Sequence, residues 1–377
     1  MMPKKLVSYR KYLHAHPELS GYEFKTSAYI REVLAACSSA QFYEVAKTGL
    51  LVQFKGENPE NHVLLRCELD ALPIHEAPGK WTNYGSNSDG VSHKCGHDGH
   101  MAILMGVTEQ LEKHPPNGTV SLLFQPAEET GIGSNLVVND PVFNKVCKPT
   151  KVFALHNIPG RTMGEIIVKN GDFSSSVISA KVVLKGKASH AAAPENGENP
   201  IYMISKFIQT VKAMENRDVE SEEFRLLTPI YVKAGSEDFG ISASYGELGY
   251  TMRAKSHDQL DALKKTFEFY VLNSARSKGL TVNVSWLAEF RGVRNADQSV
   301  EIIKKAGLEL GLTVFNKAIP YSWGEDFGVF TEKYSGAMFG VGAGISTPPL
   351  HDKNYDFPDE IIDTCVKLFM KIIQKAQ

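Results

Sequence analysis

The densest group of residues with chemical potential is the run His93-Lys94-Cys95-Gly96-His97-Asp98-Gly99-His100. Cysteine thiolates and histidine imidazoles are natural ligands for zinc and for several other divalent transition metals. The two glycines let the backbone turn tightly, so that side chains only two positions apart can converge on one point. The Cys95-x-His97 pair alone is a weak signal, because a free thiol near a histidine explains it equally well.

Further candidate side chains follow the ends of apolar runs of the sequence. They are Asp70 after Val63–Leu69, Glu128 and Glu129 after Val120–Phe124, His156 after Val152–Leu155, and His351 in the Gly- and Pro-rich loop after Ala337–Val341. In an open α/β sheet, ligands bind at the carboxyl ends of the strands. We therefore expect these side chains to gather at one edge of a sheet, with Cys95 and His97.

The adjacent carboxylates Glu128 and Glu129 indicate a division of labour. Neighbouring residues in a loop diverge, so one can bind a metal ion while the other faces water. A divalent metal ion lowers the pKa of water, and a nearby carboxylate can take the proton and pass it to a leaving amine. Most such pairs lie in a solvated acidic turn, but the position of this pair immediately after a buried strand and Pro126 favours a role in this chemistry.

A histidine far along the chain offers a further function. His190 lies in the small-residue loop Gly186–Pro194, after a run with strand character. Hydrolysis of an amide requires a donor for the developing oxyanion, and a histidine can provide one. The spacing alone favours an ordinary loop histidine over this role.

The elements that must position these residues alternate between strands and helices. The runs after which the candidates lie are continuous rather than alternating, as expected for strands buried on both faces of a sheet covered by helices. From about Phe173 to Ala288 the sequence pattern changes to strands in which apolar and polar residues alternate, together with two helices, Asn199–Met214 and Asp258–Ser277. We predict an α/β catalytic domain (residues 1–172 and 289–377) interrupted by an inserted α+β lid or dimerisation domain (173–288).

Composition excludes several classes of protein. The 377 residues carry Lys+Arg 41 against Asp+Glu 43, a formal net charge of −2, which gives no electrostatic footprint for nucleic acid or an anionic membrane. The five cysteines are an odd set without regular spacing, unlike a disulfide framework. No segment approaches the roughly 18 uninterrupted apolar residues of a membrane span. We expect a cytoplasmic protein without nucleic-acid or membrane partners.

Eight motifs follow one another in order along the chain. Seven are LRCELDALPI (65–74), HKCGHDGHMA (93–102), FQPAEETG (124–131), ALHNIPG (154–160), GKASHAAAP (186–194), GEDFG (324–328) and PLHD (349–352), and HAHPELSGYE precedes them near the start of the chain. Together these motifs resemble peptidase family M20, and the closer similarity is to its aminoacylase-like branch, which includes hippurate hydrolases, N-acetyldiaminopimelate deacetylases and auxin-conjugate hydrolases. The resemblance implies a metal-dependent hydrolase of an N-acyl amino acid or a similar small amide.

The same resemblance implies roles for single residues. Cys95 would bridge two divalent metal ions (Zn, Mn, Ni or Co), Glu129 and His351 completing one site and His97 and His156 the other. Glu128 would be the general base, and Asp70 would orient a ligand. In the inserted domain, His190 would reach the substrate carbonyl oxygen and Arg253 would meet a substrate carboxylate. The resemblance also implies a homodimer that pairs through the inserted domain.

The sequence departs from the family pattern at two positions. Family members usually have alanine where Lys94 stands and aspartate where Glu68 stands. Neither is an expected ligand, so the departures bear on the surroundings of the metal ions and on metal preference.

Two other functions compete with the metal-dependent hydrolase. In a cysteine hydrolase, Cys95 would be the nucleophile and a histidine its base. A non-catalytic amino-acid or peptide binding protein could use the same fold, although such a protein would have no need of a general base at Glu128.

Overall fold

The computed structural model describes residues 2–78 and 83–377, which divide into two compact units. The first unit comprises Met1–Phe173, Val293–Ala318 and Glu325–Gln377. The second comprises Ser174–Gly292 and Ile319–Gly324. Compared with the predicted insert, the second unit ends at Gly292 instead of residue 288. It also takes six residues, Ile319–Gly324, from the part assigned to the catalytic domain.

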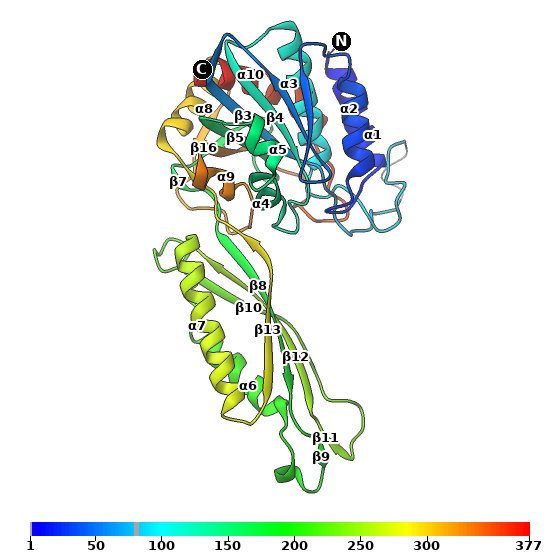
Figure 1. The fold of residues 1–377 in the computed structure, drawn as a ribbon, viewed down its shortest axis with the longest axis vertical. Helices are drawn as coiled ribbons and strands as arrows, with labels where there is room; N and C mark the ends of the chain where they lie inside the picture. The colour runs from blue at the N-terminus through cyan, green and yellow to red at the C-terminus, as the bar shows by residue number, and fades with distance from the viewer. Residues whose placement is uncertain (1, 79–82) are drawn as a thin grey trace. The chain divides into compact units, whose positions relative to one another are not determined.

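Within the described residues, the first unit is built on an eight-stranded sheet of order β1-β2-β4-β3-β5-β16-β6-β15 (Figure 1). Its strands are β1 (Gln41–Val45), β2 (Gly49–Phe54), β3 (Asn58–Glu68), β4 (Gly118–Gln125), β5 (Lys151–Ile158), β6 (Ile166–Val168), β15 (Val314–Asn316) and β16 (Ser335–Gly342). A further short pair joins β7 (Gly171–Asp172) to β14 (Arg294–Asn295). The expected α/β class is confirmed.

The central strands β3, β4, β5 and β16 run parallel to one another. Leu65 pairs with Leu122 on one side and with Phe153 on the other, and all three side chains are fully buried. Continuous apolar runs favour this arrangement, because both faces of each strand are covered. The carboxyl ends of these four strands therefore lie at one edge of the sheet.

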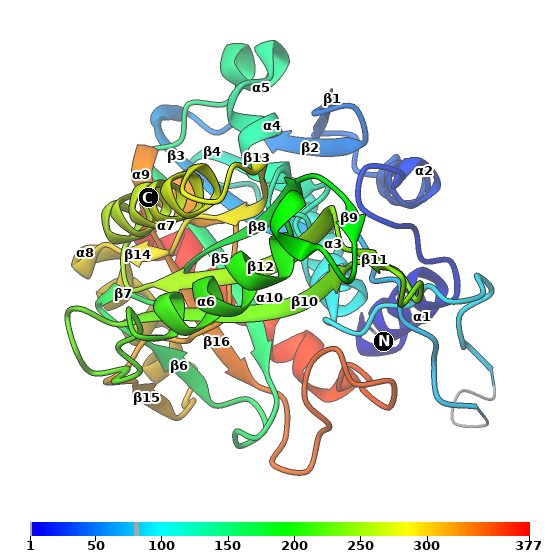
Figure 2. The same cartoon turned by 90° about the horizontal axis from the view of Figure 1, so that it is seen from below.

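Helices cover both faces of this sheet. They are α1 (Met2–Ala15), α2 (Phe24–Leu34), α3 (His97–Lys113), α4 (Gly133–Val138), α5 (Pro141–Val146), α8 (Asp297–Glu309), α9 (Gly328–Lys333) and α10 (Ile362–Ala376). Helices α3 and α10 contact each other and β3, whereas α4 contacts β4 and α9 contacts β16 (Figure 1). Figure 2 shows α2 beside the β1–β2 margin of the sheet, where it contacts β2.

The second unit is a four-stranded antiparallel sheet of order β10-β12-β8-β13 within the described residues. Its elements are β8 (Ser176–Lys185), β9 (Ser189–His190), α6 (Pro200–Lys212), β10 (Arg225–Ala234), β11 (Ile241–Ser242), β12 (Tyr245–Ala254), α7 (His257–Arg276) and β13 (Thr281–Phe290). Along β8, buried Ile178, Ala180, Val182 and Leu184 alternate with partly exposed residues. Helices α6 and α7 cover the buried face, as this period predicts.

None of the helices formed by residues 2–78 and 83–377 combines the length and the apolar character that crossing a bilayer requires.

Candidate metal centre

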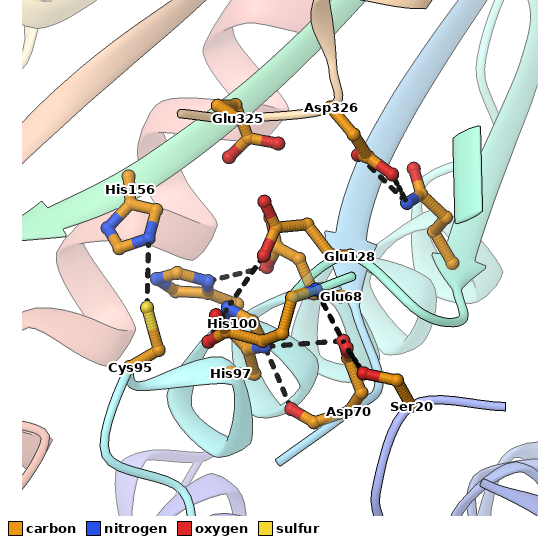
Figure 3. Close-up of polar contacts among 12 residues, drawn as sticks. Ser20, Glu68, Asp70, Cys95, His97, His100, Glu128, His156, Glu325 and Asp326 are labelled. Atoms are coloured by element: carbon orange, nitrogen blue, oxygen red, sulfur yellow. Dashed lines mark hydrogen bonds and ion pairs between the residues drawn. The ribbon is translucent and has the colours of Figure 1, made fainter. Parts of the chain in front are cut away.

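The ends of the parallel strands bring most of the predicted site residues together (Figure 3). Ligand atoms of Cys95, His97 and His156 lie within 4.8 Å of one another, and so do those of Cys95, Glu129 and His351. Cys95 belongs to both groups. A third group of the same size joins His97 to Glu128 and Glu129. Asp70 lies beside them, whereas His190 and Arg253 belong to the second unit.

Cys95 and His97 are placed by the turn that starts α3. Gly96 has φ +94°, a left-handed conformation that favours glycine. A Cβ atom added at Gly96 would lie 2.7 Å from Oδ1 of Asn157 and 2.8 Å from the Tyr355 hydroxyl. The tight turn therefore requires glycine, and it directs Cys95 and His97 toward the strand ends.

Both histidines of the first group are oriented through Nδ1. Nδ1 of His97 donates a hydrogen bond to the carbonyl oxygen of Asp70 at 2.8 Å. Nδ1 of His156 donates to the carbonyl oxygen of Asn157 at 2.9 Å, and its Nε2 faces Sγ of Cys95 at 3.6 Å. Such outer hydrogen bonds fix the ring and present Nε2 as the atom that can bind a metal ion.

The carboxylates Glu128 and Glu129 lie in a constrained turn after β4. Ala127 has φ +54°, and its N–H donates to Oε1 of buried Glu23 at 2.8 Å. A Cβ atom at Gly133 would lie 1.7 Å from the carbonyl oxygen of Pro126, so the turn can close only over a glycine. Glu128 is buried at 5% exposure, which distinguishes this pair from a solvated acidic turn.

Asp70 touches both groups of candidate ligands. Its Oδ2 accepts hydrogen bonds from the Ser20 hydroxyl at 2.7 Å and from the N–H of Glu129 at 2.9 Å. Its carbonyl oxygen accepts the bond from His97. One residue thus holds the backbone of Glu129 and the ring of His97.

A buried charge network beside Glu128 was not anticipated from the sequence. Arg66, fully buried on β3, donates to Glu68, to Gln125 and to Asp326, and lies 3.0 Å from Oε1 of Glu325. Carboxylate oxygens of Glu128, Glu325 and Asp326 lie within 4.8 Å of one another. The signal for this network was an arginine inside an otherwise apolar run, since a charge in a buried strand requires a partner.

The electrostatics of the cluster favour a cation. Burial and the carboxylates of Glu325 and Glu129 hold the pKa of Glu128 well above its ordinary value. Burial lowers the pKa of His97, but the side-chain carboxylate of Asp70 and the nearby carboxylates of Glu68 and Glu129 outweigh it and raise this pKa to about 10. The excess of negative groups therefore stabilises positive charge at His97.

Two buried atoms that form no hydrogen bond in the described part of the chain show that these residues fit a metal ion. Nε2 of His97 and Oε1 of Glu129 have no hydrogen-bond partner among the described residues. His100 differs, because its ring nitrogens lie 2.7 Å from Oε2 of Glu68 and 2.6 Å from Oδ1 of Asn157. Buried polar atoms are usually paired, and a thiol, imidazoles and a carboxylate are the donors that divalent transition metals take.

The surroundings of Cys95 disfavour its use as a nucleophile. Burial and the carboxylates of Glu129 and Glu128 raise the pKa of its thiol well above the ordinary value. Burial and His100 lower the pKa of His156 to about 3. A catalytic cysteine requires the opposite shifts, toward a thiolate and an imidazolium.

His190 and Arg253 lie in the second unit. His190 is exposed on β9, paired with Ile241 of β11, and its Nδ1 accepts the N–H of Ala192 at 3.0 Å. The ring therefore offers Nε2–H as a donor when neutral. Arg253, on β12, donates to the carbonyl oxygen of Ser322 at 2.7 Å.

Comparison with known proteins places this site in context. The model of peptidase family M20/M25/M40 matches residues 64–375. An N-acetyl-L-cysteine deacetylase of Bacillus subtilis is 31% identical over 344 residues, covering 90% of this chain and 81% of the relative. An N-acetyldiaminopimelate deacetylase of Bacillus licheniformis is 30% identical over 365 residues, covering 96% of each chain. The structure of a dinuclear metal binding peptidase from family M20 of B. subtilis aligns with a TM-score of 0.82 at 26% identity, covering 99% of this chain and 97% of that one.

Proposed function

The chain belongs to peptidase family M20/M25/M40 and is a metal-dependent amidohydrolase, and from this premise we propose that its substrate is an N-acyl amino acid or a similar small amide. The relatives named as deacetylases of N-acetylcysteine and N-acetyldiaminopimelate support this substrate class. They also favour an enzyme over a non-catalytic binding protein.

The proposed cofactor is a pair of divalent metal ions bridged by Cys95. Glu129 and His351 complete one site, and His97 and His156 the other. The observation that carries this assignment is that Cys95 belongs to both three-residue groups, each within 4.8 Å. Thiolate, imidazole and carboxylate donors admit Zn, Mn, Ni or Co. When bound, the metal ions supply Lewis acidity, which polarises a carbonyl oxygen and lowers the pKa of water.

In this proposal, side chains of the protein transfer the proton and position the reacting groups. Glu128 takes a proton from the attacking water and passes it to the leaving amine. Asp70 holds His97 and the backbone of Glu129 in place through the contacts already described. His190 donates its Nε2–H to the carbonyl oxygen as negative charge develops there, and Arg253 meets the substrate carboxylate.

We further propose that the enzyme is a cytoplasmic homodimer. All five cysteines lie among the described residues and form no disulfide there, which suits a reducing compartment. In the second unit, β10 is an edge strand with Ile230 and Val232 exposed at 58% and 46%, a surface that a second copy would cover. Analytical ultracentrifugation at micromolar concentration tests this: a fully active monomer would contradict it.

A hydrolysis screen tests the function itself. Protein dialysed against chelator is supplied with Zn, Mn, Ni or Co and offered N-acetyl, N-benzoyl and N-succinyl amino acids. We expect hydrolysis of at least one acyl class, restored only by added metal. Activity that survives exhaustive dialysis, or hydrolysis of none of these compounds with any metal, would overturn the proposal.

A further inference from the structure

We propose that Lys94 is a positioning residue whose buried ammonium holds His351 against Cys95 and so sets the affinity of one of the two metal sites. The inference rests on the proposed two-metal function but concerns a residue outside the ligand set. Lys94 immediately precedes Cys95 in the chain.

The ammonium of Lys94 is buried without exposure, which is rare for lysine unless it is paired. Nζ lies 2.5 Å from Oε1 of Glu76 and donates to the carbonyl oxygen of Tyr355 at 3.0 Å. Glu76 is itself held, because it also contacts Nε2 of His14 at 2.8 Å and accepts the N–H of Ser86 at 2.7 Å. The ammonium therefore ties the turn at Tyr355 to a fixed carboxylate.

The backbone of Lys94 also holds the start of that turn. The N–H of His351 donates to the carbonyl oxygen of Lys94 at 2.8 Å. Lys94 thus holds the segment 351–355 at both ends, by its carbonyl at His351 and by its ammonium at Tyr355. Tyr355 is buried, and its hydroxyl accepts a hydrogen bond from Asn157 at 2.6 Å.

His351 needs such support. Its backbone has φ +68°, a left-handed conformation that is strained for a residue other than glycine and persists only where the surroundings hold it. Its side chain is 51% exposed, so packing does not fix the ring. Its Nε2 lies 3.7 Å from Oε1 of Glu129, the carboxylate with which it would share a metal ion. Loosening the turn would therefore weaken this site and spare the site of His97 and His156.

The test is a titration of chelator-treated protein with Co²⁺, followed by the thiolate–cobalt absorption and by calorimetry. Lys94→Met removes the ammonium and keeps the side-chain length. Outer contacts of metal ligands typically contribute about 10- to 100-fold in affinity, so we expect one Co²⁺ affinity to fall by about tenfold or more and the other to change by less than about twofold. Lys151→Met is the matched control, because that ammonium also donates to a backbone carbonyl, of Ala376 at 3.0 Å, but at the opposite end of β5 from His156.

A double-mutant cycle separates positioning from general structural damage. If Lys94 acts through His351, Lys94→Met in a His351→Ala background adds less than about twofold to the loss. Three results would overturn the inference: equal loss of both Co²⁺ affinities in Lys94→Met, no change in either affinity, or fully additive effects of Lys94→Met and His351→Ala. Should loss of the ammonium beside Glu76 prevent folding, the variant Lys94→Met/Glu76→Gln removes both charges and is judged by the same criteria.

Failure of this inference is distinguishable from failure of the proposed function. A chain that hydrolyses N-acyl amino acids while Lys94→Met binds both Co²⁺ ions normally contradicts the inference alone. A chain that shows the predicted Co²⁺ losses but hydrolyses none of the tested amides contradicts the proposed function alone.

Discussion

Sγ of Cys95 lies 3.6 Å from Nε2 of His156, whose Nδ1 is held by the carbonyl oxygen of Asn157. The lone pair of Nε2 therefore faces the sulfur, an arrangement in which both atoms can bind one metal ion. The same pair of atoms would serve a cysteine hydrolase only if the pKa shifts were reversed. This contact leads to the first prediction.

Cys95→Ser should lower metal occupancy, because a hydroxyl is a poor substitute for a thiolate ligand. The measurement is metal content per chain after equilibration with Zn²⁺ and desalting. Cys37→Ser, which alters another buried cysteine outside the cluster, is the control and should bind metal normally. Unchanged stoichiometry in Cys95→Ser would show that Cys95 is not a ligand.

Asp70→Asn should weaken metal binding by about 10- to 100-fold while the chain remains folded, because Asp70 orients the Glu129 backbone and lies against His97. Affinity is measured by competition with a chelating indicator. Asp140→Asn is a matched control, since that carboxylate also accepts backbone N–H groups, those of Val142 and Phe143, outside the cluster. Equal affinities in Asp70→Asn and wild type would remove Asp70 from the site.

His190→Ala should reduce kcat by about 100-fold or more, the usual cost of losing an oxyanion donor, and leave metal content unchanged. Because His190 is exposed, the free energy of unfolding should change by less than about 0.5 kcal/mol. His114→Ala removes another exposed histidine, at the far end of α3 from the cluster, and should retain full activity. A variant of His190 with normal kcat would exclude the proposed hydrogen bond.

Acid should destabilise the first unit through His62. Burial lowers the pKa of His62 to about 4, and its ring contacts the Ser121 hydroxyl at 2.8 Å and the N–H of Lys148 at 3.3 Å, an arrangement for neutral imidazole. The unfolded chain takes up the proton first, so the free energy of unfolding falls as pH drops from about 6.5 toward 4, by about 3 kcal/mol at most from this group. Urea unfolding across this range should show a smaller fall for His62→Gln, and parallel curves for the two proteins would refute the assignment.

Much of the fold could be predicted because a strand that is buried on both faces of a sheet is a continuous run of apolar residues. The continuous runs that became β3, β4, β5 and β16 predict covered parallel strands, and residues that follow such strands meet at one edge. The segment Ile319–Gly324 could not be assigned in this way. It joins the second unit through hydrogen bonds such as the one from the Ser175 N–H to the carbonyl oxygen of Tyr321. An irregular loop has no periodic pattern of apolar residues, so its sequence does not indicate which unit it packs against.

The candidate site was predictable where residue type indicates metal chemistry, as at Cys95 and His156. Arg66, Glu325 and Asp326 were not assigned roles, because their meaning depends on a contact between β3 and a segment more than two hundred residues later. The contacts of Lys94 could not be predicted either, because its partners Glu76 and Tyr355 come from separate loops that only the folded chain brings together.

Glu128→Gln tests the central claim most directly, because it removes the proposed base and keeps the shape of the side chain and every proposed ligand. We expect metal content equal to wild type and kcat/KM for a hydrolysed N-acyl amino acid reduced by about 100-fold or more, in the range of general acid–base catalysis. Metal content equal to wild type with undiminished kcat/KM would contradict the account.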